Sequence, residues 1–363
     1  MNALTRLAKL VSQGTWSFYS DGVLFTRSNL SYRARFNLIL QLISKQLRLE
    51  STLGIPYSLV VEPASVCNLN CVTCPAGQNH KMCSPAILRM EDFQKTIDLI
   101  GEYITFIQMW SWGEPCLHPQ LPEMIAYARS KDIVVITSTN AHFLNDDQQV
   151  ARLVNSGLNE LILAVDGTTQ EVYDRFRPGG NLEVVLAGIR NLVRIKREQG
   201  VTTPRLHMRM VINPFNEDQK DEFLNLAQNL GVDVVSYKKV DIGMGGLSGD
   251  ESMLPKNKDY IIESHYGDYP YKCVAFWGFP ALSSSGHIGL CSLDAKRRTD
   301  LAHISTIDDF KQIWNSEKAR KFRRAIKKDP DAFPFCRECI CREPDFKNAY
   351  FDCTILTPVH SRN

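Results

Sequence analysis

The sequence has no long hydrophobic run, no secretory signal and no strong charge of either sign. None of its apolar segments approaches the ~20 residues that cross a bilayer, which excludes an integral membrane protein. The amino-terminal segment Leu4-Thr-Arg-Leu-Ala-Lys-Leu-Val11 is interrupted by charge, unlike a signal peptide. The formal net charge is only +2, which provides no extended footprint for nucleic acid. We therefore expect a cytoplasmic protein without a nucleic-acid partner.

Length and composition indicate an enzyme with a sizeable core. The 363 residues are 44% hydrophobic and 23% charged, enough for one large domain and a smaller one. The chain has 11 cysteines, an odd number gathered at short intervals. Cysteines in this arrangement belong to a reducing compartment and bind metal.

Three cysteines stand close together directly after an apolar strand candidate, 57–61. They are Cys67, Cys71 and Cys74. Four thiolates close every iron of an iron–sulfur cluster, whereas three leave one iron open to an outside ligand, as a cluster that activates a substrate requires. A structural zinc site is the alternative, with His80 or Cys83 as the fourth ligand.

Short β-branched runs alternate with helical patterns through the middle of the chain. The predicted strands lie near Leu59 and over 104–109, 133–137, 160–165, 206–212 and 232–238. The predicted helices cover 121–130, 146–155, 182–198 and 217–230. Repeated units of this kind imply an α/β fold with a parallel sheet, here a partial (β/α)6 TIM-like barrel whose active centre gathers where the strands end. We expect an N-terminal helical extension over 1–56, the barrel over 57–240 and a C-terminal domain over 241–363.

The spacing of Cys67, Cys71 and Cys74 resembles the signature of the radical SAM enzymes. The resemblance implies that the open iron of a [4Fe-4S] cluster binds S-adenosylmethionine. An electron from the cluster, delivered by a reducing donor such as flavodoxin or ferredoxin, then yields a 5′-deoxyadenosyl radical. The protein's task is to aim and shield that radical.

The same resemblance implies a set of cofactor-binding residues at successive strand ends. The Gly-Glu-Pro segment after the second strand would hold the methionyl amine, and small polar residues after the third and fourth strands would contact the ribose and carboxylate. An arginine in the following loop would lie near the carboxylate. These residues are Gly113, Glu114, Pro115, Ser138, Asn140, Asp166 and Arg177. Read singly, the polar positions also suit turns or helix caps, and the arginine also suits a solvated loop.

The last third of the sequence carries a second cysteine constellation, Cys273, Cys291, Cys336 and Cys339. Two distant thiolates and a CxxC pair describe a four-thiolate site closed by the fold. The pattern resembles the SPASM extension, or its shorter version twitch, and implies one auxiliary [4Fe-4S] cluster. A zinc ribbon is the alternative. Asp345 stands where a further SPASM cysteine would fall, so Cys341 and Cys353 are either ligands of a second cluster or reduced thiols.

An auxiliary cluster with every iron occupied suits electron transfer rather than substrate binding. A substrate radical would then be either oxidised or quenched by a hydrogen donor. Cys116 and Cys83 are the candidate catalytic thiol donors, although a buried inert cysteine is a simpler reading of either.

Two basic segments lie outside these motifs. Over 32–48, Phe36, Ile39, Leu40, Ile43 and Leu47 share one helical face, with Asn37, Gln41, Ser44, Lys45 and Arg48 opposite. Such a helix either makes peripheral contact with a membrane or, more commonly, packs on its own barrel. The run 317–328 suits a solvated helix face, and the glycine-rich segment 243–249 suits a linker.

The single auxiliary domain favours an enzyme that dehydrogenates or epimerises a small molecule, namely a sugar, cyclitol or lipid-linked headgroup. One alternative is a maturase that modifies a peptide or protein side chain, although no dedicated leader-binding domain is expected before the barrel. Another is a non-catalytic iron–sulfur or zinc protein. The substrate pocket would use strand-end residues such as His207, Arg209, Tyr237 and Lys239.

Overall fold

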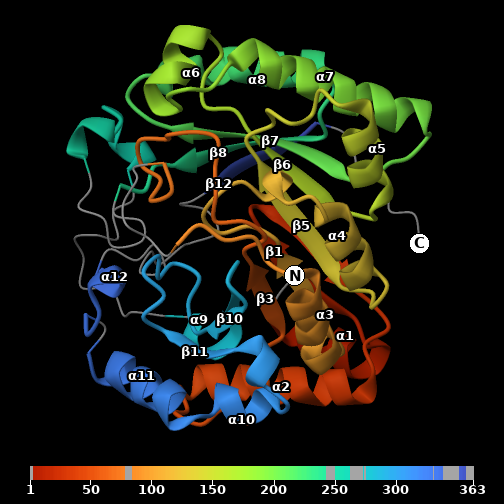
Figure 1. Ribbon diagram of the computed structural model, residues 1–363, viewed down its shortest axis with the longest axis vertical. Coiled ribbons are helices and arrows are strands. Elements are labelled where there is room, and N and C mark those ends of the chain that lie inside the picture. The colour runs from red at the N-terminus through yellow and green to blue at the C-terminus, as the bar shows by residue number, and fades with distance from the viewer. Residues whose placement is uncertain are drawn as a thin grey trace.

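The computed structural model describes residues 3–77, 84–242, 250–261, 273, 275–329, 331–337 and 351–356. Its centre is a run of six parallel strands that lie side by side in chain order (Figure 1). The strands are β3 (Ser58–Val61), β4 (Phe106–Gln108), β5 (Val134–Thr139), β6 (Glu160–Ala164), β7 (Arg205–Ile212) and β8 (Val234–Lys239).

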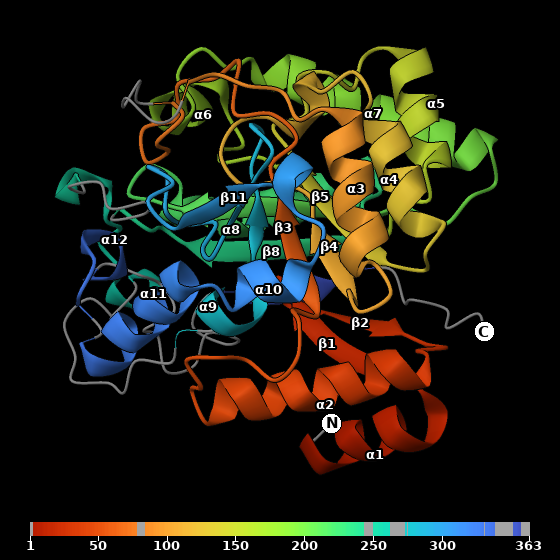
Figure 2. The same ribbon diagram turned by 60° about the horizontal axis from the view of Figure 1, so that its bottom comes forward.

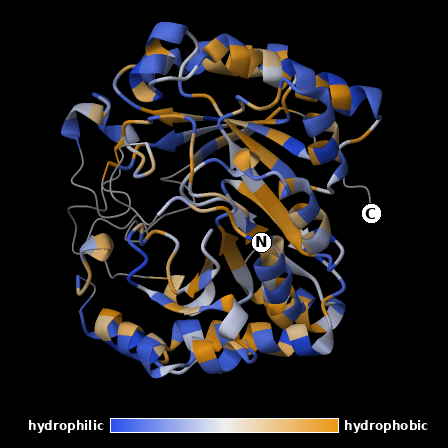
Figure 3. Ribbon diagram, in the orientation of Figure 1, coloured by the Kyte–Doolittle hydropathy of each residue, from blue (hydrophilic) through white to orange (hydrophobic). Residues whose placement is uncertain are grey.

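Helices connect these strands, as parallel pairing requires. They are α3 (Met90–Ile100), α4 (Leu121–Arg129), α5 (Asp147–Asn155), α6 (Gln170–Phe176), α7 (Leu182–Glu198) and α8 (Lys220–Leu230). Figure 3 shows mostly hydrophobic strands inside a layer of helices that alternate between the two colours. The predicted α/β partial barrel is thereby confirmed.

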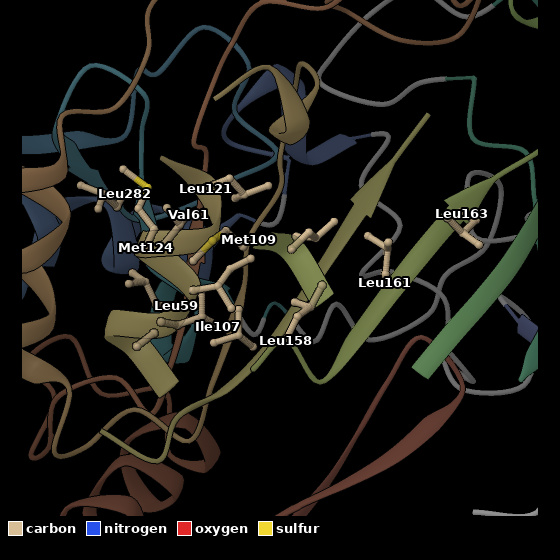
Figure 4. Close-up of a cluster of buried hydrophobic side chains, with 14 of the residues drawn as sticks. Leu59, Val61, Ile107, Met109, Leu121, Met124, Leu158, Leu161, Leu163 and Leu282 are labelled. Atoms are coloured by element: carbon tan, nitrogen blue, oxygen red, sulfur yellow. The ribbon is translucent and has the colours of Figure 1, made fainter. Parts of the chain in front are cut away.

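The core between sheet and helices is built from alternate residues of each strand. Leu59, Val61, Ile107 and Met109 leave one face of β3 and β4 and lie near Leu121 and Met124 at α4 (Figure 4). All of them are at most 2% exposed. The other residues of each strand point into the barrel, where the site is built.

The C-terminal segment adds strands to both edges of the same sheet. β9 (Ala281–Leu282) pairs in parallel with β3, and β10 (His287–Gly289) and β11 (Asp300–His303) continue outward from it. β12 (Phe351–Ile355) pairs antiparallel with β8 at the far edge. The helices of this part are α9 (Ala275–Gly278), α10 (Phe310–Trp314), α11 (Glu317–Lys328) and α12 (Pro334–Arg337).

The N-terminal extension contains strands as well as the predicted helices. It runs α1 (Ala3–Gln13), β1 (Trp16–Ser20), β2 (Val23–Arg27) and α2 (Tyr32–Gln46). The β1–β2 hairpin lies beneath the barrel in Figure 2. Phe18 stacks on Phe106 of β4 with ring centroids 4.5 Å apart, and Asp21 in the hairpin turn forms a 2.9 Å ion pair with Arg209 of β7. The hairpin therefore closes the amino-terminal end of the barrel.

Helix α2 packs with the face opposite to the one we expected. Asn37 and Ser44 are buried, and they pair with backbone groups of the segment that follows the helix: Asn37 with both N–H and C=O of Ile55, and Ser44 with the N–H of Leu53. Phe36 is 64% exposed. The expectation that the apolar face packs on the barrel is wrong, because the returning chain needs hydrogen-bond partners at the helix surface. No helix in the described ranges is long and apolar enough to span a membrane.

Candidate active site

The first cysteine cluster lines a cavity of about 230 Å³ at the carboxyl ends of the strands. Cys67, Cys71 and Cys74 share its wall with residues in the last turn or last two positions of β5, α6, β7 and β8 or in the segments that follow β4, β5, α6 and β8. These include Trp110, Ser111, Trp112, Gly113, Glu114, Pro115, Ser138, Thr139, Asn140, Phe176, Arg177, Val211, Lys238 and Asp241. Side chains from distant parts of the sequence thus meet at one edge of the sheet, as this fold requires.

The cysteine loop is held by its own turns and by the chain after α6. The N–H groups of Asn70 and Val72 donate to the carbonyls of Pro178 and Phe176. A Cβ at Gly77 would lie 2.4 Å from the backbone nitrogen of Cys71, so only glycine permits this close return. The loop is therefore fixed on both sides of its thiols.

The thiols are half-buried and free of disulfides. Burial raises the pKa of Cys67, and it raises the pKa of Cys71 to about 12 against the opposing charge of Arg177. Thiols in such a place ionise readily only when a metal supplies positive charge. In the described part of the chain, no three His, Cys, Asp or Glu side chains converge tightly enough for a single ion. Three soft donors around a cavity of this size fit a cluster.

The segment after β4 packs tightly against the cysteine loop. Gly113 has a φ of +82°, and a Cβ there would lie 2.4 Å from the carbonyl oxygen of Ala64. The N–H of Glu114 donates to the Val66 carbonyl at 2.8 Å. Glycine is needed at position 113 both for its backbone conformation and for this approach.

Glu114 joins the ends of β4 and β5. Its buried carboxylate accepts hydrogen bonds from the hydroxyl of Thr139 and the N–H of Asn140, each at 2.8 Å, and from the N–H of Cys116 at 2.9 Å. Burial raises the pKa of Glu114, and these three donors oppose the shift. The carboxylate thus fixes two segments of the cavity wall relative to each other.

Asp166 stands behind the cavity wall rather than in it. Its carboxylate accepts from Nε of Arg177 at 2.5 Å and from the N–H of Val211 at 2.6 Å, and it is fully buried. Nη1 of Arg177 lies 3.8 Å from Sγ of Cys71. The structure therefore brings Arg177 to the cysteine loop and gives Asp166 the task of orienting it.

Cys116 does not reach the cavity. It lines a separate cavity of about 340 Å³ together with His118 and Phe143, among others. Burial, together with the neighbouring Glu114 carboxylate, raises its thiol pKa well above the ordinary value. The structure therefore places the Cys116 thiol outside the cavity that Cys67, Cys71 and Cys74 line. Cys83, the other candidate donor, and His80 lie outside the described residues.

The four residues predicted to line the substrate pocket point to opposite faces of the sheet. His207 and Arg209 point into the barrel, where His207 contacts Glu160 at 2.9 Å and Ser236 at 2.6 Å. Tyr237 points away, and its hydroxyl donates to the carbonyl of Lys220. Lys239 likewise donates to the carbonyl of Ile261. None of these four residues lines the cavity beside the cysteine loop.

Several cavity residues were not anticipated from the sequence. Lys238 and Asp241 enter from the end of β8, and Trp112 enters from the segment after β4. Neighbouring residues of a strand point to opposite faces, so Lys238 and Lys239 of β8 cannot both face the cavity. The sequence does not show which of the two points inward. Nothing in the sequence alone marks Trp112, whose indole N–H is buried without a partner in the described structure.

One of the C-terminal cysteines, Cys291, lies beside this site. Cys273 and Cys336 are buried, and Cys291 is half-buried just after β10. Cys339 and Cys341 lie outside the described residues. Cys291 borders a small cavity whose wall also includes Ser111 and Trp112, and the Ser111 hydroxyl donates to the carbonyl of Ser292 at 3.2 Å. The Ser111–Trp112 segment thus separates the two cysteine regions.

An ion-pair network ties the C-terminal part to the first barrel strand. The carboxylate of Glu62, at the end of β3, accepts from the hydroxyl of Ser284 at 2.7 Å and forms a close ion pair with Arg297. Both charged side chains are nearly buried. The network fixes the region around Cys291 relative to the cysteine loop that begins a few residues after Glu62.

Family models match both cysteine regions. The model of the radical SAM superfamily matches residues 61–227, and that of the SPASM iron–sulfur cluster-binding domain matches residues 273–340. The chain is a member of the radical SAM superfamily and carries a C-terminal SPASM domain. It is therefore a radical SAM enzyme. It binds S-adenosylmethionine at a [4Fe-4S] cluster and holds an auxiliary cluster, to which the soft thiol donors described above are suited.

Known relatives of the chain include peptide-modifying enzymes. A PqqA peptide cyclase from Bradyrhizobium diazoefficiens is 22% identical over 338 residues, which cover 84% of each chain. The mycofactocin maturase MftC of Mycobacterium ulcerans is 29% identical over 182 residues, 50% of this chain and 47% of MftC. Streptococcus suis SuiB bound to S-adenosylmethionine has the same fold, with a TM-score of 0.60 at 14% identity over 89% of this chain and 77% of SuiB. The relatives contradict our prediction of a sugar, cyclitol or lipid-linked substrate.

Proposed function

We propose that this chain modifies a side chain of a peptide or protein by radical chemistry. The proposal is carried by the cavity in which the three thiols share a wall with Lys238 and Asp241, five strands along the sheet from the cysteine loop. The likeness to a PqqA peptide cyclase supports a peptide substrate, since it extends over most of both chains.

The cavity residues suit a polar substrate held away from water. Burial lowers the pKa of Lys238, and the neighbouring Arg209 adds to the shift. Asp241 is only 3% exposed. Together they offer hydrogen-bond donors and acceptors to peptide amide groups, while Trp110 and Trp112 cover apolar surface beside them.

We propose a net oxidation of the peptide. When bound, the cofactors supply a radical that removes hydrogen and an auxiliary cluster that accepts the remaining electron. The position of Cys291 beside Ser111 and Trp112 supports this, because only one short segment separates the two cysteine regions. Such chemistry needs a reducing donor of the flavodoxin or ferredoxin type and a compartment that keeps thiols reduced, for which we propose the cytoplasm.

Transfer of deuterium to 5′-deoxyadenosine tests the substrate class. The anaerobically reconstituted protein is incubated with S-adenosylmethionine, reductant and pools of synthetic peptides, each pool deuterated in one type of side chain. Deuterated sugars and cyclitols form the parallel set. We expect label from at least one peptide pool to reach 5′-deoxyadenosine. Transfer from the sugar or cyclitol set alone would refute the proposal.

A further inference from the structure

Exposed apolar side chains are concentrated at one end of the molecule. Among the described residues, twelve large hydrophobic side chains are exposed, and ten of them fall between Leu4 and Leu53. On α2, the spacing of Tyr32, Phe36, Ile43 and Leu47 places them on the side opposite the buried positions. Tyr32 is 83% exposed and Leu47 is 60% exposed. An apolar stripe of this length on a surface helix marks an interaction site.

The neighbouring helix α11 carries strong positive charge. Its sequence, EKARKFRRAIKK, has seven basic residues and one acidic residue. Only Arg323 of the seven is buried. Four lysines of the helix have no ion-pair partner within the described ranges: Lys318, Lys321, Lys327 and Lys328. These four lysines thus face solvent without an ion pair to any described residue, whereas Arg320 and Arg324 are paired with carboxylates.

Contacts at the end of α2 hold the two helices together. Arg324 of α11 forms a 2.9 Å ion pair with Glu50, and Arg323 donates to the Glu50 carbonyl at 3.0 Å. Asn315, between α10 and α11, donates to the carbonyl of Thr52. Figures 1 and 2 both show α2 and α11 along the same end of the molecule, away from α7. The apolar stripe and the basic helix therefore lie at the same end of the molecule.

The N-terminal unit as a whole is also positively charged. Residues 3–53 contain seven basic and two acidic residues, although the whole chain has a net charge of only +2. Both acidic residues, Asp21 and Glu50, are already paired with arginines. A surface that combines aliphatic and aromatic side chains with unneutralised lysines is complementary to a surface that is both apolar and anionic.

We propose that the face formed by α2 and α11 binds the surface of a bilayer containing anionic phospholipid. Phe36, Ile43 and Leu47 would enter the acyl boundary, and the lysines of α11 would lie at the phosphate layer. The proposal is independent of the substrate of the active site.

Two other occupants suit the face less well. A second copy in symmetric contact would bring two basic helices into one interface, where like charges repel. A peptide would need a groove, and the groove beside α2 is lined by Arg33 and Lys311 but also by Asp308 and Asp309, so it selects no charge. Of the stripe, only Phe36 lines this groove, whereas Tyr32, Ile43 and Leu47 lie on the outward side of the helix, which suits a flat layer.

Vesicle co-sedimentation of the reconstituted full-length protein tests the proposal. Vesicles of equal parts phosphatidylcholine and phosphatidylglycerol should bind the protein, and binding should weaken as salt is added. Pure phosphatidylcholine vesicles should bind it weakly. The Lys321→Glu/Lys328→Glu variant should lose more than about fivefold in partitioning for each lysine replaced, because the change both removes a positive charge and adds a negative one. The Phe36→Asp/Ile43→Asp variant should lose most of the bound fraction.

Matched controls lie elsewhere on the surface. Arg190→Glu removes an exposed basic residue on α7, and Ile355→Asp changes an exposed apolar residue on β12. Both should bind vesicles like the unmodified protein. All variants should retain iron content and release of 5′-deoxyadenosine; if the double aspartate variant does not, Phe36→Ser/Ile43→Ser replaces it.

Three results would overturn the proposal. The first is a binding pattern without the expected differences. The protein would then bind equally to vesicles with and without phosphatidylglycerol, or the α2 and α11 variants would bind vesicles as well as the control variants do. Another is a concentration-dependent dimer in sedimentation velocity that the Phe36 variant disperses while vesicles go unbound. The third is binding of a poly-glutamate peptide without vesicle binding, which would assign the face to an acidic peptide.

Discussion

Nε of Arg177 donates to the carboxylate of Asp166 across 2.5 Å, with both side chains largely withdrawn from solvent. The same guanidinium reaches to 3.8 Å from Sγ of Cys71. Asp166 also accepts the N–H of Val211, so its two oxygens are both engaged. The ion pair therefore holds a positive charge beside the cysteine loop. The charge belongs to Arg177, the residue directly after α6.

Asp166→Asn should weaken the fold and the site together. It leaves the buried Arg177 without a counter-charge, which typically costs about 3–5 kcal/mol. The exposed pair of Asp147 and Arg194 provides the control. Asp147→Asn there should change the free energy of unfolding far less, because solvent screens the pair. Anaerobic urea unfolding measures both. Equal losses in the two variants would mean that the buried pair contributes no more than a surface contact.

Gly113→Ala should prevent the correct assembly of the cysteine loop. The added Cβ meets the Ala64 carbonyl, and the backbone at φ +82° disfavours any side chain. Gly200→Ala is the control, because Gly200 also has a positive φ but has no atom within 4 Å of the added Cβ. It should cost only about 1–2 kcal/mol and leave iron content unchanged. Normal iron binding by Gly113→Ala would show that the close approach is dispensable.

Much of the fold could be predicted because it depends on local patterns. The β-branched runs near Leu59 and over 206–212 form strands of the sheet, and the spacing of the first cysteines holds them on one loop. Helix α6 was missed because its seven residues are too few for a clear helical period. Such short elements are fixed by the tertiary packing around them.

The orientation of single side chains was harder to predict. Lys238 lines the cavity and Lys239 does not, because the register of β8 against β7 sets which residues point inward. Cys116 follows Pro115 into a short helical turn that carries its thiol behind Glu114. Helix α2 buries its polar face because Asn37 donates a hydrogen bond to the backbone carbonyl of Ile55. Each outcome depends on partners that are distant in sequence or outside the periodic pattern.

Trp112→Phe should weaken the binding of S-adenosylmethionine. The indole N–H of Trp112 is buried beside the cysteine cavity without a partner among the described residues, and such a group usually pairs with a ligand. Loss of one hydrogen bond to a charged ligand should lower affinity about tenfold. Trp16→Phe removes another unpartnered buried indole N–H, far from the cavity in β1, and should leave the affinity unchanged. Equal affinities in all three proteins would contradict a ligand role for Trp112.

Cys67→Ala and Cys336→Ala should separate the two metal centres. The first removes a thiol from the cavity wall and should abolish reductive cleavage of S-adenosylmethionine. The second removes a buried C-terminal thiol and should leave cleavage partly intact while product formation stops. Release of 5′-deoxyadenosine and mass spectrometry of the peptide measure the two events. Full turnover by Cys336→Ala would remove the auxiliary cluster from the chemistry.

His207→Gln should reduce the loss of stability in mild acid. His207 is fully buried inside the barrel, and burial lowers its pKa below the ordinary 6.5 despite its contact with Glu160. As the pH falls through 6.5, His207 is protonated in the unfolded chain but stays neutral in the folded protein, so the free energy of unfolding decreases.

Glutamine cannot titrate, so His207→Gln removes this contribution. Urea midpoints at about pH 7.5 and about pH 5.5 measure it, on either side of the ordinary histidine value. The drop between them should be smaller in His207→Gln than in the unmodified protein or in His303→Gln, which removes a histidine nearer the surface. An unchanged drop would mean that His207 becomes protonated in the folded barrel, with Glu160 as its counter-charge.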